Sequence, residues 1–104
     1  MPSFGLIHYN QPDLQGLDAF LEYAATIGFD AVELFLSDYW PEGEDNPESR
    51  AEDVRKKLDA AGLKACAITA ANDFVYLDED NINREVQRMA RVCKAAQILG
   101  TNIL

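Results

Sequence analysis

The stretch GFDAVELFL, residues 28–36, decides which fold we expect for this chain. It opens with a glycine, a residue that can end a helix because it adopts the left-handed backbone conformation without strain. A short and mostly apolar run of strand-forming residues follows. Strands buried on both faces read as such runs, and they belong to parallel sheets covered by helices. The carboxylate inside the run, Glu33, must be paired, neutral or functional, because burying a bare charge is costly.

The same order of helix, glycine and strand occurs twice more. Gly28, Gly62 and Gly100 recur at intervals of roughly 35 residues, the length of one strand, one crossover helix and two loops. The chain is therefore predicted to be an α/β protein built of repeated βα units with parallel strands. We expect strands near residues 4–8, 31–36, 65–70 and 102–104, and helices near 14–27, 48–61 and 79–99 on one side of the sheet.

Local signals support the helix boundaries. Asp13 is the expected N-cap of the first helix, and Asn46 followed by Pro47 is a good start for the second. An irregular loop is expected over residues 37–47. The third helix carries an apolar stripe at steps of three and four residues, formed by Ile82, Val86, Met89, Cys93, Ala96 and Leu99.

Composition limits the classes of function. The chain has 104 residues, 48% of them hydrophobic, which is enough for one small packed domain. Its net charge of −9 argues against nucleic acid and against an anionic membrane surface as partners. With no membrane-spanning run and no basic leader followed by an apolar core, we expect a cytoplasmic protein. Cys66 and Cys93 lack CxxC spacing and are expected to be reduced and buried, with a disulfide or a metal pair as the alternatives.

Three segments in this order resemble one known superfamily. They are FGLIHYN at 4–10, GFDAVELF at 28–35, and AITAANDFV at 67–75 followed by a long helix that ends in AAQILGTNIL at 95–104. The chain resembles the xylose-isomerase-like TIM-barrel superfamily of sugar (phosphate) isomerases and epimerases. Such barrels have eight βα units and need about 250 residues. The resemblance implies that residues 1–104 are the first three to four units, the N-terminal half of an incomplete barrel domain, either a fragment or a half that assembles with another part.

The resemblance also concerns cofactors. In the family a divalent metal (Mn, Mg, Co or Zn) is held by Glu, Asp and His side chains on strands of the second half, where two glutamates usually move the proton. Those strands lie outside residues 1–104, so the resemblance implies no cofactor, metal ligand or identified catalytic residue within this chain, and a divalent metal for the full-length barrel.

Candidate binding residues follow from the loops after the strands, which form the active face of such barrels. Each loop offers an aromatic ring and a hydrogen-bonding side chain, the mixture that sugars require. The candidates for substrate binding are His8, Asn10, Glu33, Tyr39, Trp40, Asn72 and Phe74. Alternation assigns Glu33 and Phe35 to the barrel interior, and we expect His8 to point into the barrel mouth. The alternatives are a structural aromatic rim, a satisfied core histidine and a carboxylate in a structural network.

The leading hypothesis is the N-terminal part of a metal-dependent sugar isomerase or epimerase that moves a proton next to a carbonyl. A dehydratase or other lyase on the same barrel, and a non-catalytic α/β assembly or binding module, remain alternatives. The acidic charge counts against the DNA-repair endonuclease branch. The expected partner is a sugar or sugar-like small molecule. Unpaired strand edges and an uncovered interior face, including Leu6 and Phe35, predict self-association or pairing with the missing barrel half.

Overall fold

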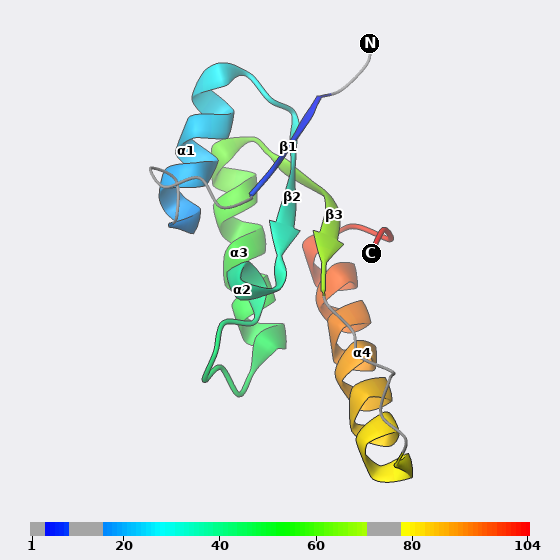
Figure 1. Ribbon diagram of the computed structural model, residues 1–104. Helices are drawn as coiled ribbons and strands as arrows, with labels where there is room; N and C mark the ends of the chain where they lie inside the picture. Colours follow the sequence, from blue (N-terminus) through cyan, green and yellow to red (C-terminus); the bar gives the residue numbers. More distant parts are fainter. Residues whose placement is uncertain (1–3, 9–15, 71–77) are drawn as a thin grey trace.

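The computed structural model describes residues 4–8, 16–70 and 78–104. Strands and helices alternate along these residues (Figure 1). In chain order they are β1 (Gly5–Ile7), α1 (Leu17–Ile27), β2 (Ala31–Phe35), α2 (Leu36–Tyr39), α3 (Pro47–Ala61), β3 (Lys64–Thr69) and α4 (Glu79–Leu99). The strands form one three-stranded sheet in the order β1-β2-β3, with both pairings parallel. The predicted α/β class with parallel βα units is therefore confirmed.

The glycines end the helices as predicted. Gly28, Gly62 and Gly100 have φ angles of 101°, 72° and 88° and follow α1, α3 and α4 directly. The amide of Gly100 donates to the carbonyls of Ala96 and Gln97, which closes the last turn of α4. Each glycine thus turns the chain out of a helix and toward the next strand.

The first residues of the helices agree with the prediction for α3 and α4 but not for α1. α3 begins at Pro47, and the side chain of Asn46 caps it by accepting a hydrogen bond of 3.1 Å from the amide of Ser49. α4 spans the predicted residues. α1 begins at Leu17 after Gly16, later than predicted, and Asp13 lies outside the described residues. A short helix, α2, occupies the start of the segment expected to be a loop.

The strand predicted at residues 102–104 does not form in the described structure. The amide of Ile68 donates to the carbonyl of Ile103 at 3.1 Å, and the hydroxyl of Thr101 donates to the carbonyl of Cys66 at 2.9 Å. These bonds hold residues 101–103 beside β3. The prediction of a strand is wrong because a single backbone hydrogen bond does not make a ladder.

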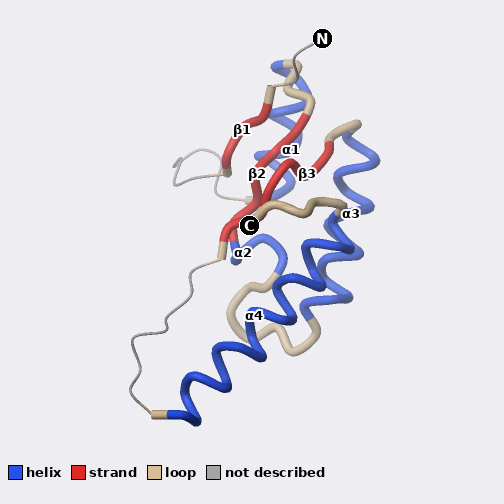
Figure 2. Tube along the Cα trace, turned by 90° about the vertical axis from the view of Figure 1, so that its right-hand side faces the viewer, coloured by secondary structure: helices blue, strands red, loops and turns tan. Residues whose placement is uncertain are grey.

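One core holds the helices against one face of the sheet. Val32 and Leu34 of β2 are completely buried, and Ile68 of β3 joins them. The cluster collects side chains from three helices: Leu17, Phe20, Leu21 and Ala24 of α1; Ala51, Val54 and Leu58 of α3; and Val92, Ala95, Ala96 and Leu99 of α4. Figure 2 shows α3 and α4 running side by side next to the strands. The prediction that the helices lie on one side of the sheet is confirmed.

The other face of the sheet, which we call the open face, carries no helix in the described structure. Ile7 is 40% exposed on this face, and Glu33 and Phe35 are partly exposed. A Cβ added at Gly5 would meet the sulfur of Cys66 at 3.2 Å, so the side chain of Cys66 in β3 reaches across β2 toward β1 on this face. Cys66 is exposed, which corrects the expectation of a buried thiol, because a strand face without a covering layer stays in contact with solvent.

Leu6 was expected on the open face, and this expectation is wrong. Strand alternation gives that face to Gly5 and Ile7. Leu6 packs against the helix-side core instead.

The buried stripe of α4 is shorter than predicted. Val86 is 52% exposed and Cys93 is exposed, whereas the buried residues begin at Val92. The reason for the exposure of Val86 is visible in Figure 1: the N-terminal half of α4 extends beyond the sheet, where no other described element can cover it. Cys93 follows the buried Val92 but lies on the solvent side of the helix, so the expectation that its thiol is buried is wrong. The described residues span 47 × 28 × 25 Å. None of their helices has a run of apolar residues long enough to cross a membrane.

Candidate functional site

The candidate site is the edge of the sheet where the three parallel strands end. His8 follows β1, Glu33 lies two residues before the end of β2, and Tyr39 and Trp40 stand at the end of α2, which continues directly from β2. Asn10, Asn72 and Phe74 lie outside the described residues. The site can therefore be described around four of the seven predicted residues.

His8 is held between the sheet and α1. Its Nδ1 lies 2.8 Å from Oδ1 and 3.0 Å from Oδ2 of Asp38, and its ring stacks on Phe20 at a centroid distance of 4.3 Å and an angle of 9°. The side chains of His8 and Asp38 are only 10% and 6% exposed. The expectation that His8 points into the barrel mouth is wrong for its ring, because strand alternation puts it on the helix side together with Leu6. Whether His8 contacts substrate stays a prediction.

Asp38 has its geometry fixed from two sides. Its Oδ2 accepts a hydrogen bond of 2.9 Å from the amide of Phe35, and its carbonyl accepts one of 3.2 Å from Nε of Arg50. An ionised carboxylate can only accept, so Nδ1 of His8 carries the hydrogen in the His8–Asp38 bond. The pair ties the end of β1 to the first turn of α2, which sets the path of the chain out of β2.

Glu33 lies on the open face and is bound to the neighbouring strand. The hydroxyl of Thr69, the last residue of β3, donates to its Oε1 at 2.7 Å. Glu33 therefore lies on the open face, the face that the sequence assigned to the barrel interior, and Thr69 holds it there. A carboxylate on this face can accept hydrogen bonds from hydroxyl groups of a ligand.

Tyr39 binds the backbone of Thr69 from the helix side of the sheet. Its side chain is completely buried, and its hydroxyl donates to the carbonyl of Thr69 at 3.2 Å. Burial raises the pKa of Tyr39 to about 12, although the nearby Arg88 lowers it in part. Tyr39 therefore fixes the end of β3 in the described structure, and a contact with substrate stays a prediction.

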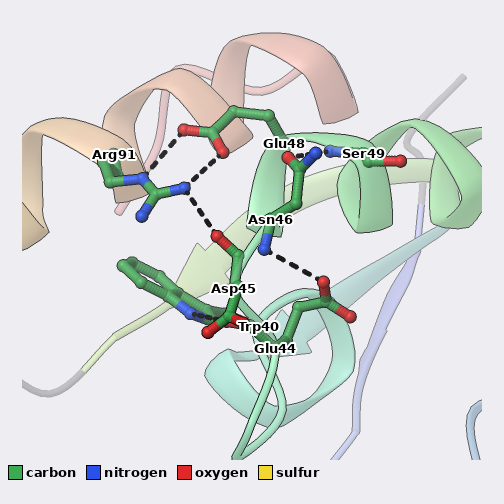
Figure 3. A network of polar contacts seen from close by, with 7 residues as sticks. All are labelled: Trp40, Glu44, Asp45, Asn46, Glu48, Ser49 and Arg91. Atoms are coloured by element: carbon green, nitrogen blue, oxygen red, sulfur yellow. Dashed lines mark hydrogen bonds and ion pairs between the residues drawn. The ribbon is translucent and has the colours of Figure 1, made fainter.

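Trp40 belongs to a network that joins the loop before α3 to α4 (Figure 3). Its Nε1 donates to the carbonyl of Glu44 at 2.9 Å, and the guanidinium of Arg91 lies 5.2 Å from the ring centroid. Arg91 also donates to both carboxylate oxygens of Glu48, at 3.1 and 2.8 Å, and to the carbonyl of Asp45 at 3.2 Å. One face of the indole is thus taken by an arginine from a helix far along the chain.

The ion pair within this network changes the titration of both partners. Hydrogen bonds from Arg91 lower the pKa of Glu48 from 4.5 to about 2, and the same bonds raise the pKa of Arg91. The carboxylate therefore remains ionised over the whole range in which ordinary glutamates take up a proton. The ion pair between α3 and α4 therefore persists throughout that range.

The described residues of this edge contain no cluster of metal ligands. Across residues 4–8, 16–70 and 78–104, no three or more His, Cys, Asp or Glu side chains are grouped closely enough to hold a metal ion. A cavity of about 520 Å³ lies at the opposite edge, where β3 begins and α3 and α4 end, and its lining includes Arg55, Asp59 and Lys64. The residues described here do not fit the divalent metal that the family resemblance implies.

Three partners were not predicted from the sequence: Asp38 for His8, Thr69 for Glu33, and Arg91 for Trp40. Alternation could have indicated Thr69, because it ends a strand that runs beside β2. Arg91 gave no signal, because it lies 51 residues after Trp40 in the sequence and depends on how α4 packs.

The described fold is similar to several solved structures. A xylose isomerase-like TIM barrel/4-hydroxyphenylpyruvate dioxygenase fusion protein shares 25% identity with a TM-score of 0.68, and the match covers 96% of this chain and 15% of that chain. A xylose isomerase domain containing protein from Salmonella typhimurium LT2 shares 25% identity with a TM-score of 0.69, over 97% of this chain and 35% of that chain. The probable 3-DHS dehydratase AsbF of Bacillus anthracis, involved in petrobactin synthesis, shares 15% identity with a TM-score of 0.64, over 97% and 36%.

This chain therefore spans roughly a third or less of each of these structures. No sequence match is found among curated proteins. The sequence profile of the xylose isomerase-like TIM barrel matches residues 21–104, which is most of the chain. A parallel sheet in sequence order with its helices on one side is the arrangement found in part of such a barrel. The chain belongs to the xylose isomerase-like TIM-barrel family and covers a partial barrel.

Proposed function

We propose that this chain contributes the first three βα units of a barrel that isomerises or epimerises a sugar or sugar-like molecule. The reaction is the transfer of a proton at a carbon next to a carbonyl. The observation that carries the proposal is the position of Glu33, whose carboxylate lies on the open face near the carboxyl ends of the strands. That edge is where TIM barrels bind their substrates. Family membership supports the class of reaction, although fold alone does not determine it.

In this proposal the chain's own residues bind and orient the substrate. Glu33 accepts hydrogen bonds from substrate hydroxyls, and the partly exposed ring of Trp40 contacts an apolar face of the sugar. Asn10, Asn72 and Phe74 complete the binding set from the loops after β1 and β3. The His8–Asp38 pair holds the end of β1 in register with the start of α2 and so keeps these loops in position.

A divalent metal of the kind that the family resemblance implies would polarise the substrate carbonyl. The described residues do not offer a ligand set for it. We propose that the metal ligands and the groups that move the proton come from other strands of the whole protein. Binding of the small molecule, and pairing of this partial barrel with the rest of the barrel, belong to the same proposal.

The test is hydrogen exchange in the whole protein. Unphosphorylated aldoses and ketoses are incubated with it in D₂O and Mn²⁺, and proton NMR follows loss of the signal at the carbon next to the carbonyl. An isomerase or epimerase incorporates deuterium there without loss of water from the sugar. Glu33→Gln is expected to raise KM, because an amide accepts hydroxyl hydrogen bonds less strongly than a carboxylate. Absence of exchange with the whole panel would contradict the proposal.

A dehydratase is the second candidate, because one of the similar structures is a probable 3-DHS dehydratase. Its 15% identity supports the shared fold only. The same NMR assay separates the two reactions. A dehydratase removes a hydroxyl together with the neighbouring proton, and the product is an unsaturated carbonyl compound with new ultraviolet absorption and a new olefinic or enol signal.

A further inference from the structure

We propose that Thr69 is a positioning residue for Glu33, and that the two side chains form a subsite for an uncharged hydroxyl group of the substrate. This inference rests on the proposed function, since it concerns the same edge of the sheet. It goes further by naming the residue that fixes the carboxylate and the kind of substrate group that the carboxylate accepts.

The pairing of β2 and β3 brings Thr69 close to Glu33. In the register of β2 and β3, Glu33 stands opposite Ala67, and Thr69 stands opposite Phe35. Thr69 therefore reaches Glu33 diagonally from the pair two positions further toward the carboxyl ends of the strands, which lies on the same face of the sheet. The distance of 2.7 Å from Oγ1 to Oε1 is that of a strong hydrogen bond to a carboxylate.

Thr69 is itself held in place. The hydroxyl of the buried Tyr39 donates to its carbonyl at 3.2 Å from the helix side of the sheet. The branched side chain of a threonine has few available rotamers. Its backbone and its side chain are thus both restrained, and the threonine can fix the direction in which the Glu33 carboxylate points.

The hydrogen bond between Thr69 and Glu33 decides which groups the pair can offer to a ligand. A threonine hydroxyl has a single hydrogen, and Thr69 gives it to Glu33. What the pair then offers is lone pairs and one negative charge, so a ligand must supply the hydrogen. A hydroxyl group does this, whereas a phosphate group brings further negative charge. The open-face neighbours Ile7 and Phe35 bring no positive charge to offset it.

The experiment measures binding and turnover by the whole protein with two probes, D-fructose and D-fructose 6-phosphate. The variants are Thr69→Val, which keeps the shape and removes the hydroxyl, Thr69→Ser, which keeps the hydroxyl, Glu33→Gln, and the double variant. Thr101→Val is the matched control, because it removes a hydroxyl that donates to the carbonyl of Cys66 instead. Calorimetry gives Kd for each probe, and turnover of any probe that reacts gives kcat and KM.

Thr69→Val is expected to weaken binding of D-fructose about tenfold, the size expected for a hydrogen bond to a charged group. The change should appear in Kd or KM and leave kcat unchanged, Thr69→Ser should stay near the parent, and Thr101→Val should have no effect. In the Glu33→Gln background, Thr69→Val should have little further effect, because the two residues act as one unit. Equal effects in both backgrounds, or tighter binding of the phosphate ester than of D-fructose, would overturn the inference.

A second measurement does not depend on a ligand. In the crystal structure of the Thr69→Val protein, the Glu33 carboxylate is expected to leave the position that it has beside β3. If it keeps that position, Thr69 does not set it and the inference fails, even where the sugar reaction is found. If neither probe binds but Glu33 moves, the positioning role stands, and the hydroxyl subsite and the proposed function are both rejected.

Discussion

The polar side chains at the carboxyl edge of the sheet are held in pairs on its two faces. On the helix side, His8 binds Asp38 against Phe20. On the open face, Thr69 binds Glu33, and Tyr39 joins the two sides through the carbonyl of Thr69. Each buried polar group thus has a partner, as the cost of burying unpaired polar atoms requires. The described residues contain no buried side-chain nitrogen or oxygen without a hydrogen-bond partner.

Tyr39 gives a prediction at this scale. Tyr39→Phe removes the hydrogen bond to Thr69 and should lower the free energy of unfolding by about 1 kcal/mol at neutral pH. The parent has a further pH dependence, because burial raises the pKa of this phenol from 10.0 to about 12. Its contribution is complete below pH 10 and is lost as the pH rises toward 12, since the unfolded chain ionises first. Urea unfolding of both proteins between neutral pH and pH 12 checks this.

The Phe variant should lose less stability than the parent over the range from pH 10 to about 12. Parallel stability curves for the two proteins in that range would contradict a buried and protonated Tyr39.

The sequence could predict the face of Glu33 but not its partner. Alternation within a strand is a local property, so the side of Glu33 follows once one face of β2 is known to be buried. The side of His8 was misjudged, because a strand of three residues carries too short a pattern to show which of its faces is apolar. The Glu33–Thr69 bond depends on the register between β2 and β3, which includes an irregularity between Val32 and Glu33 that no local pattern indicates.

At the scale of the elements, the carboxyl edge is extended by α4 and by the loop before α3. The N-terminal half of α4 runs past the sheet. Arg91, in the C-terminal half of α4, joins this helix to the first turn of α3 through Glu48 and to the preceding loop through Trp40 (Figure 3). Helix ends were predictable because glycine and Asn-Pro signals act locally. The buried stripe of α4 was not, because burial depends on how far the sheet reaches beside the helix.

The Arg91–Glu48 pair predicts a pH dependence. Glu48→Gln should lower stability at neutral pH, because it removes a carboxylate whose pKa Arg91 holds at about 2 instead of 4.5. Stability from such a pair is complete above the unfolded pKa and is lost as the pH falls through the folded one. The difference between parent and variant should therefore shrink between pH 4.5 and about 2. Thermal unfolding across this range measures it.

Glu52→Gln is the matched control, because Glu52 is an exposed glutamate of the same helix, α3. It should show no comparable pH-dependent difference from the parent. A difference for Glu48→Gln that stays constant down to pH 2 would show that the pair does not form in solution.

The glycine at the end of α4 gives a second prediction at this scale. Gly62→Ala should cost about 1 kcal/mol, from the positive φ alone, because an added Cβ meets nothing within 4 Å. At Gly100 the added Cβ would collide with the guanidinium of Arg55, which donates to the carbonyl of Ile98. That guanidinium is the far end of a flexible side chain that is 45% exposed, so it can move aside at little cost. Gly100→Ala should therefore cost about as much as Gly62→Ala. Chemical denaturation of both variants tests this, and a clearly larger loss for Gly100→Ala would contradict it.

At the scale of the whole molecule, the described residues form a layer of helices on one face of a sheet whose other face is open. Phe4 and Leu104 are 63% and 58% exposed, and Ile7 is 40% exposed on the open face. Exposed apolar groups together with unpaired strand edges favour association. The family and the order of the strands could be predicted from the sequence, because the order of helix, glycine and strand repeats along the chain.

Self-association is the prediction that follows for the chain of residues 1–104. Sedimentation at rising concentration should show dimers or larger species. Ile7→Lys should reduce them by adding a charge to the open face, whereas Tyr23→Lys, at a residue of α1 that is 42% exposed, should change little. A monomer at all concentrations, or equal effects of the two lysines, would show that the open face does not drive association.

The position of a bound sugar tests most directly the proposal that the substrate binds beside Glu33. A crystal structure of the whole protein with D-fructose is predicted to hold the sugar at the carboxyl edge of the strands, with a hydroxyl group within hydrogen-bond distance of Glu33. A sugar in the cavity of about 520 Å³ beside Arg55 and Lys64, at the amino end of β3, would contradict the account.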